Sequence, residues 1–122
     1  MAEIGNPIPP RALLIVMMSG ISLEGMDLAY IEFYLKKGKW SFTIGPYQSK
    51  AYSEEWKQRL SNLIHSSALD FVKTHVEFGH LIGKKIHEFI AEHHLKVDLI
   101  GAHGHTVFHQ PELGFTSQIG DG

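Results

Sequence analysis

Residues 12–18 read ALLIVMM and residues 26–35 read MDLAYIEFYL. A stretch that is apolar at every position is typical of an inner strand covered on both faces of a sheet. The second stretch is rich in β-branched and aromatic residues, which favours another strand beside it. Residues 19–25, SGISLEG, place Gly20 and Gly25 between the two. The pattern predicts two neighbouring strands joined by a glycine-bearing turn.

A third strand is predicted from residues 39–45, KWSFTIG, in which Trp40, Phe42 and Ile44 alternate with polar residues. Gly38 lies in the segment KKGK and suits a tight hairpin turn. The three strands therefore form a meander. We expect the face that carries Trp40, Phe42 and Ile44 to be buried.

The apolar period then lengthens from two residues to that of a helix. Ser53 can cap a first helix whose apolar positions are Trp56, Leu60, Leu63 and Ile64. After the break at residues 66–70, SSALD, a second helix is predicted from about residue 71 to residue 94. Its apolar stripe is Val72, Val76, Ile82, Ile86, Phe89 and Ile90. Gly79 and Gly83 inside this helix each cost about 1 kcal/mol relative to alanine, so we expect another segment to approach closely there.

Two short apolar segments, residues 97–102 (VDLIGA) and 105–109 (HTVFH), are predicted as further strands. The order of elements indicates a mixed sheet with helices packed against it, which is an α/β layered domain. The 122 residues are enough for one domain with a core of its own.

Composition excludes several classes of protein. The formal net charge of −2 provides no electrostatic footprint for nucleic acid or an anionic membrane. The absence of cysteine excludes a disulfide framework and thiolate metal sites. No segment reaches membrane-spanning length, and the N-terminus lacks the features of a signal peptide. We expect a soluble, cytoplasmic protein.

The turn at residues 20–27 has two interpretations. Gly20 and Gly25 let backbone N–H groups face a phosphate, Ser22 offers a hydroxyl, and Glu24 and Asp27 offer carboxylates that suit hydrated Mg²⁺. The segment lacks the Gly-Lys-Ser/Thr ending of a Walker A loop. The alternative is an ordinary glycine-bearing turn.

Histidines 103, 105 and 109 also allow two interpretations. Imidazoles that alternate along a strand can converge on zinc, but no further ligand at helical spacing completes a set. We favour histidines that line a polar crevice and predict no metal ligands among them. His93 and His94 suit the negative end of the second helix.

Two motifs carry a resemblance to a known family. MSGISLEGMD, residues 18–27, resembles the signature MSGTSLDG-x-D of anhydro-N-acetylmuramic acid kinases. GAHGHTVFHQP, residues 101–111, and FTSQIGDG, residues 115–122, resemble HGQTV-x-H-x-P and T-x-QIGDG of the same family. The similarity extends from about Leu13 to the end of the chain, with the motifs in the family's order.

The resemblance implies a specific activity and fold. Members of this family use ATP and Mg²⁺ to hydrolyse the anhydro ring of 1,6-anhydro-N-acetylmuramic acid and phosphorylate the sugar at O6, in peptidoglycan recycling. The fold implied is a ribonuclease H-like mixed sheet, the actin-like ATPase domain of the sugar kinase, Hsp70 and actin superfamily. By resemblance, the nucleotide site comprises Gly20, Ile21, Ser22, Leu23, Glu24, Gly25, Met26 and Asp27. The sugar lies near His103, Gly104, Thr106 and Gln118.

The chain departs from the family motifs at a few positions. Ile21 replaces threonine, Glu24 replaces aspartate, His105 replaces glutamine and Ser117 replaces an apolar residue. Family members are also several times longer. We therefore expect residues 1–122 to be an incomplete N-terminal domain of a two-domain kinase, with the general base beyond Gly122, inactive alone and prone to form homo-oligomers.

Two other functions stay open at this stage. The chain could be a stand-alone binding or regulatory module that keeps the fold without catalysis. It could also be a ribonuclease H-like nuclease that uses Asp27, Glu32 and Asp70 for two metal ions, although its charge disfavours a nucleic-acid substrate.

Overall fold

The computed structural model describes residues 11–18 and 23–122, and within residues 11–18 it describes the side chains of Leu13, Ile15 and Met17. The elements follow one another along the chain as β1 (Arg11–Met18), β2 (Gly25–Lys36), β3 (Lys39–Ala51), α1 (Glu54–Asn62), the short 3₁₀ helix η1 (Leu63–His65), α2 (Ala68–His93), β4 (Leu99–Ala102), β5 (His105–Gln110), the 3₁₀ helix η2 (Pro111–Leu113) and β6 (Phe115–Ile119).

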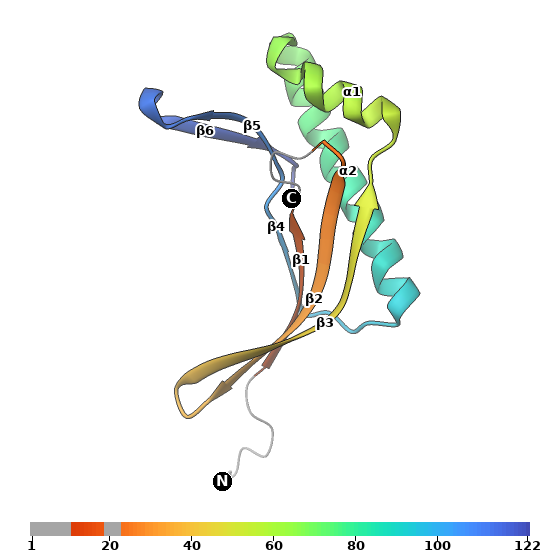
Figure 1. Cartoon of the computed structure of the whole chain (residues 1–122), viewed down its shortest axis with the longest axis vertical. Coiled ribbons are helices and arrows are strands. Elements are labelled where there is room, and N and C mark those ends of the chain that lie inside the picture. The colour runs from red at the N-terminus through yellow and green to blue at the C-terminus, as the bar shows by residue number, and fades with distance from the viewer. Residues whose placement is uncertain (1–10, 19–22) are drawn as a thin grey trace.

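Four strands form the main sheet, in the order β3-β2-β1-β4. Strand β1 pairs antiparallel with β2 and parallel with β4, and β2 pairs antiparallel with β3. Strands β5 and β6 form a separate hairpin, which leaves the main sheet at the end where β1 and β4 stop (Figure 1). The predicted meander and the mixed α/β architecture are confirmed, whereas β6 was not predicted.

Local chemistry shapes the β2–β3 hairpin. Lys36 pairs with Lys39, so Lys37 and Gly38 form a two-residue turn, and both have positive φ, 52° and 75°. This geometry fits the turn class that favours glycine at its second position. Further along, Gly45 and Pro46 of β3 lie opposite Tyr30 at a register shift. A bulge at this point suits an edge strand, because proline cannot donate a ladder hydrogen bond.

The core lies between one face of the sheet and the helices (Figure 1). On the sheet side it contains Ile15, Met17, Met26, Leu28 and Tyr30. Helix α2 contributes Phe78, Ile82, Ile86 and Phe89. The unbroken apolar stretch 12–18 predicts that Ile15 and Val16 are buried on opposite faces of their strand. Ile15 confirms its half, since its exposed fraction is 0%. The side chain of Val16 is outside those described.

Both helices begin at predicted or readily explained caps. The Ser53 hydroxyl accepts from Trp56 N–H at 3.2 Å, as predicted. The Ser67 hydroxyl accepts from Asp70 N–H at 3.1 Å, so α2 begins at Ala68, earlier than predicted. In residues 11–18 and 23–122, no helix combines the length and apolar character that a bilayer span requires.

The predicted apolar stripes are wrong at three positions. Ile64 is exposed because α1 ends at Asn62, and the tighter winding of η1 turns this residue away from the core. Val72 and Val76 are exposed because α2 buries a neighbouring row, which starts with Thr74 and Phe78. Thr74 is tolerated there because its hydroxyl accepts from Arg59 Nη2 at 3.2 Å.

The predicted burial of Trp40, Phe42 and Ile44 is also wrong, since their exposed fractions are 64%, 62% and 59%. The far half of the β2–β3 hairpin reaches beyond the helices (Figure 1). These side chains also lie on the sheet face opposite the core, because Ile31, the partner of Ile44, follows the core residue Tyr30 in β2 and successive side chains of a strand point to opposite faces. Residues directly opposite on paired strands share a face. We call this surface the arm face; its residues are Ile31, Phe33, Leu35, Trp40, Phe42 and Ile44, in the register Leu35 to Trp40, Phe33 to Phe42 and Ile31 to Ile44.

The two helical glycines differ. A Cβ placed on Gly79 would lie 2.3 Å from the Asp121 carbonyl oxygen, so the predicted close approach is confirmed there. A Cβ on Gly83 would meet nothing within 4 Å, so the same prediction is wrong for Gly83. Gly79 therefore provides the space in which the last residues of the chain lie against α2.

Candidate functional site

The candidate site lies at the edge of the sheet where β1 and β4 end. These strands are parallel neighbours, and Met17 pairs with Ala102 at their carboxyl ends. The His103 N–H donates to the Met17 carbonyl at 2.9 Å, which continues the pairing by one residue. In open α/β sheets, ligands bind outside the carboxyl ends of the strands. The two family-like motifs thus follow adjacent strand ends.

The predicted nucleotide segment is described only in part, because Gly20, Ile21 and Ser22 lie outside the described residues. Leu23 packs partly buried against the core, and Met26 is fully buried within it. The side chains of Leu23 and Met26 therefore have structural roles. A contact between these residues and a nucleotide would involve their backbone atoms. Gly25 is required by space, since a Cβ there would lie 2.3 Å from the Lys50 carbonyl oxygen.

Two carboxylates of this segment are accessible. The Glu24 side chain is 86% exposed, with Oε1 3.8 Å from Lys57 Nζ. Its carbonyl accepts from Tyr52 N–H at 3.0 Å, which anchors the segment to the start of α1. Asp27 is exposed on β2, opposite Met18. Its Oδ1 accepts from the Ser49 hydroxyl at 2.5 Å, which orients the carboxylate.

Three of the four predicted sugar residues meet in one hydrogen-bonded group, which we call the 103/106/118 cluster. Gln118 Nε2 lies 3.1 Å from His103 Nε2 and 3.3 Å from Thr106 Oγ1. Thr106 of β5 and Gln118 of β6 are direct cross-strand partners, and His103 precedes β5. All three are partly or fully exposed and can be reached by a ligand.

The fourth predicted sugar residue, Gly104, shapes the backbone beneath this cluster. Its φ is +76°, and a Cβ there would lie 2.4 Å from the Ile119 carbonyl oxygen. Only glycine accommodates both conditions at low cost. Gly104 therefore lets the chain turn from β4 into β5 while β6 passes close beside it.

The three histidines considered for zinc have separate surroundings. His105 is buried and lies edge-on to Phe78, with ring centroids 6.2 Å apart. Burial lowers the pKa of the His105 imidazole from its ordinary value. His109 Nδ1 lies 3.1 Å from Thr116 Oγ1, on another part of the hairpin. Among the described residues, no group of three potential ligands is placed to hold a metal ion.

The acids considered for a nuclease do not assemble in the described structure either. Asp27 bonds to Ser49, Glu32 accepts from the Tyr34 hydroxyl, and Asp70 lies in the first turn of α2. Asp27 and Glu32 lie five residues apart on opposite faces of β2, and Asp70 lies on α2. This arrangement does not match the clustered carboxylates of a two-metal mechanism.

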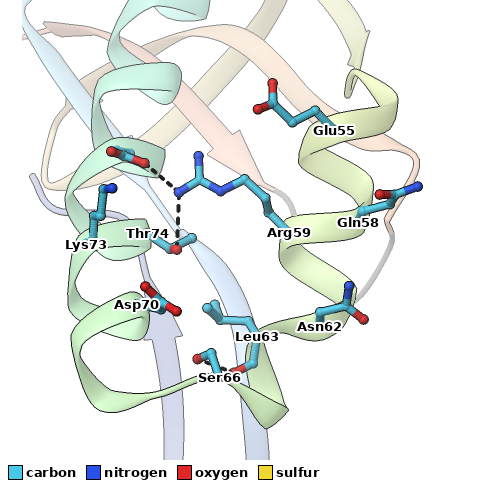
Figure 2. A pocket seen from close by; sticks show the side chains of 10 residues that line it. Glu55, Gln58, Arg59, Asn62, Leu63, Ser66, Asp70, Lys73 and Thr74 are labelled. Atoms are coloured by element: carbon cyan, nitrogen blue, oxygen red, sulfur yellow. Dashed lines mark hydrogen bonds and ion pairs between the residues drawn. The ribbon is translucent and has the colours of Figure 1, made fainter.

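Figure 2 shows an open hollow between α1 and the first turns of α2, lined by Glu55, Gln58, Arg59, Asn62, Leu63, Ser66, Asp70, Lys73, Thr74 and Glu77. None of the described residues among those predicted for nucleotide or sugar lines it. Arg59 Nη2 lies 2.5 Å from Glu77 Oε1, and its guanidinium stacks 4.2 Å from the centre of the Trp56 ring. Arg59 therefore has a structural role, because its guanidinium links α1 to α2.

Sequence reasoning missed two residues that support the site. Ser49 holds Asp27, and His75 of α2 holds the last segment of the chain: its Nδ1 accepts from Gly120 N–H at 2.9 Å, and its carbonyl accepts from Asp121 N–H at 3.2 Å. Both contacts join residues far apart in the sequence. Nothing in the local pattern around Ser49 or His75 indicates them.

The described residues thus define an α/β protein with polar side chains gathered at the carboxyl ends of parallel strands. Residues 12–122 match the model of the anhydro-N-acetylmuramic acid kinase family. The chain belongs to this family.

Individual relatives agree with this assignment. An anhydro-N-acetylmuramic acid kinase of Actinobacillus pleuropneumoniae serotype 7 is 36% identical, over 91% of this chain and 31% of its own length. Kinases of the same name from Methylorubrum populi and Ruegeria sp. are 34% and 35% identical, over 87% and 93% of this chain and 33% and 28% of their own lengths. The chain spans about a third of the length of these relatives.

Proposed function

We propose that residues 1–122 form part of an ATP-dependent kinase that hydrolyses the anhydro ring of 1,6-anhydro-N-acetylmuramic acid and phosphorylates the sugar at O6, in the cytoplasmic recycling of peptidoglycan. One observation carries the proposal: the two motif segments follow the carboxyl ends of adjacent parallel strands. Membership of the kinase family agrees with it.

The nucleotide end of the site is assigned to residues 20–27. Backbone N–H groups around Gly20 and Gly25 would face the phosphates of ATP. Glu24 and Asp27 suit Mg²⁺, because both carboxylates are exposed at the same edge and Mg²⁺ prefers oxygen ligands with retained waters. When bound there, the ion would neutralise phosphate charge.

The sugar end of the site is assigned to His103, Gly104, Thr106 and Gln118. Asp27 at the start of β2 and His103 after β4 flank β1, two strand spacings or roughly 10 Å apart. A separation of that order allows a phosphate and a sugar to lie side by side on one edge. Side chains at 103, 106 and 118 that can both donate and accept hydrogen bonds suit the hydroxyls of a sugar.

We assign the fold to the ribonuclease H-like class, as an incomplete N-terminal domain of a two-domain, actin-like kinase. The meander β1–β3, with β4 added parallel to β1, supports this assignment. Phosphoryl transfer depends on charge stabilisation from all sides of the transferred group. Because the chain spans only about a third of the length of its kinase relatives, we place the general base outside residues 1–122 and expect the chain alone not to turn over.

A binding map tests the site. Titration of the isotopically labelled chain with ATP and Mg²⁺ should shift the amide signals of residues 20–27, and titration with the anhydro sugar should shift those of residues 103–106 and 118. A Gly20→Val chain, checked by circular dichroism, serves as the control that should lose nucleotide binding. Shifts confined to the hollow of Figure 2 would contradict the assignment.

A chimera tests the activity. Residues 12–122 replace the matching third of the Actinobacillus pleuropneumoniae kinase, and sugar-dependent release of ADP is measured. We expect activity from the chimera and none from the 122-residue chain. A chimera that folds and binds both ligands without turnover would favour the stand-alone binding module instead.

Self-association is part of the same proposal. The arm face exposes Trp40, Phe42 and Ile44 together, and large exposed apolar patches mark interaction surfaces. Strand β3 is also an edge of the sheet, which can pair with another chain. We therefore expect the isolated chain to form homo-oligomers.

A further inference from the structure

The direction of the hydrogen bonds in the 103/106/118 cluster depends on which atom of the Gln118 amide makes them. The amide nitrogen Nε2, at 3.1 Å from His103 Nε2 and 3.3 Å from Thr106 Oγ1, makes both contacts. An amide nitrogen carries two hydrogens and accepts no hydrogen bond. With the amide of Gln118 in this orientation, His103 Nε2 and Thr106 Oγ1 both accept.

We infer that Gln118 is a positioning residue that fixes His103 as the neutral tautomer with its proton on Nδ1. A neutral imidazole donates from one nitrogen and accepts at the other, so an accepting Nε2 requires a protonated Nδ1. The Gln118 amide on β6 thus determines which ring nitrogen of His103 carries the proton that a ligand can accept.

The backbone holds Gln118 in place for this role. Its neighbour Ile119 is 1% exposed and pairs with His105, while Gln118 itself pairs with Thr106. The Ile119 carbonyl lies close to Gly104, and the next residue, Gly120, donates its N–H to His75 of α2 at 2.9 Å. A buried residue and a helix contact therefore follow Gln118 directly and fix its backbone.

The direction of these hydrogen bonds determines which donor and which acceptor remain for a ligand. Its internal bonds leave His103 Nδ1–H as a donor and Gln118 Oε1 as an acceptor. A donor beside an acceptor suits a hydroxyl or an amide, which both donate and accept, whereas a phosphate would favour a protonated imidazole. The inference rests on the proposed function in naming the sugar as this ligand.

The tautomer can be read directly on the 122-residue chain. Long-range ¹H–¹⁵N correlation at about pH 7.5, above the usual pKa of histidine, distinguishes the protonated ring nitrogen from the bare one. We expect the proton of His103 on Nδ1. In a Gln118→Glu chain, a carboxylate can only accept, so the proton should move to Nε2. His109, which contacts Thr116 instead, serves as the internal control and should not change.

A proton on His103 Nε2 in the wild-type chain, or an unchanged tautomer in Gln118→Glu, would overturn the inference. The sugar titration supplies the second measurement: Gln118→Leu should weaken sugar binding by about tenfold, the order expected for the loss of one or two hydrogen bonds. Equal binding by Gln118→Leu and wild type would overturn the role in recognition. If the wild type binds no sugar, the proposed function fails, while the tautomer measurement still decides whether Gln118 positions His103.

Discussion

Gly79 and Gly83 lie one turn apart in α2, and they allow a matched test of what a helical glycine contributes. At Gly83 nothing lies within 4 Å of the position that an added methyl group would take, so alanine should raise the free energy of unfolding by up to about 1 kcal/mol through its better helix propensity. At Gly79 the methyl would lie 2.3 Å from the Asp121 carbonyl oxygen. Gly79→Ala should therefore be destabilising, or displace the last residues of the chain.

Urea denaturation of the two variants beside the wild type measures both effects. Hydrogen exchange at Gly120 and Asp121, whose N–H groups bond to His75, reports any displacement of the last segment. If Gly79→Ala were as stabilising as Gly83→Ala, with exchange at these residues unchanged, the close packing of residue 121 on α2 would be refuted.

Ile15 provides a test of the core at the same scale. Its side chain is 0% exposed on the sheet face that α2 covers. Truncation to alanine removes buried groups and leaves a cavity, so Ile15→Ala should lose about 2–4 kcal/mol of unfolding free energy. Leu99→Ala is the control, because Leu99 is 60% exposed and should lose less than about 1 kcal/mol. Similar losses for both would show that β1 is not the central core strand.

At the scale of the element, the β2–β3 hairpin carries the prediction about self-association. Phe42 lies on the arm face beside Phe33, with ring centroids 6.3 Å apart, whereas Thr43 points to the other face of the ribbon, opposite Glu32. Phe42→Lys should lower the apparent mass measured by light scattering, because a charge in an apolar contact is costly. Thr43→Lys is the matched control and should leave the mass unchanged. A monomeric wild-type chain would refute the prediction.

The elements were largely predictable because their signals are local. The hairpin at Gly38, the Ser53 cap and the breaks between strands and helices depend on a few neighbouring residues. Burial was less predictable because it depends on what lies opposite. Phe42 alternates like a core residue, yet it lies on the sheet face that the helices do not cover. Thr74 is buried where Val72 was expected, and Arg59 satisfies its hydroxyl.

The candidate site shows the same difference between local signals and contacts made by residues far apart in the sequence. The motifs identified His103, Thr106 and Gln118, and the structure brings these together. The support from Ser49 and His75 could not be read from the sequence, because each joins a site residue many positions away. Strand β6 escaped prediction for a related reason: its register depends on its pairing with β5 rather than on its own composition.

At the scale of the whole molecule, stability should depend on pH through His105. Burial lowers the pKa of His105 below its ordinary value of 6.5, so the unfolded chain binds a proton more readily than the folded one. The free energy of unfolding should therefore fall as the pH drops through about 6.5, by at most about 1.4 kcal/mol per pH unit for one proton. His105→Gln removes the titrating group while keeping a polar side chain of similar length.

Denaturant titrations between about pH 7.5 and 5.5, either side of the usual histidine pKa, compare the two chains. The wild type should show the steeper dependence, and the difference between the chains isolates His105 from the exposed histidines. Equal slopes would mean that the His105 imidazole is protonated as easily in the folded state as in the unfolded one.

The parallel pairing of β1 with β4 has a kinetic consequence. The contact between Leu13 and Asp98 closes a loop of 85 residues, whereas the β2–β3 hairpin and the turns of α2 need only near neighbours. Closing a long loop costs chain entropy before the favourable free energy of its contacts is gained. High contact order therefore slows folding. The hairpin and helices can form early, but both motifs reach one edge only when the late strand β4 docks beside β1. Ligand recognition should therefore be the last property that a refolding chain acquires, after most of its secondary structure is already in place.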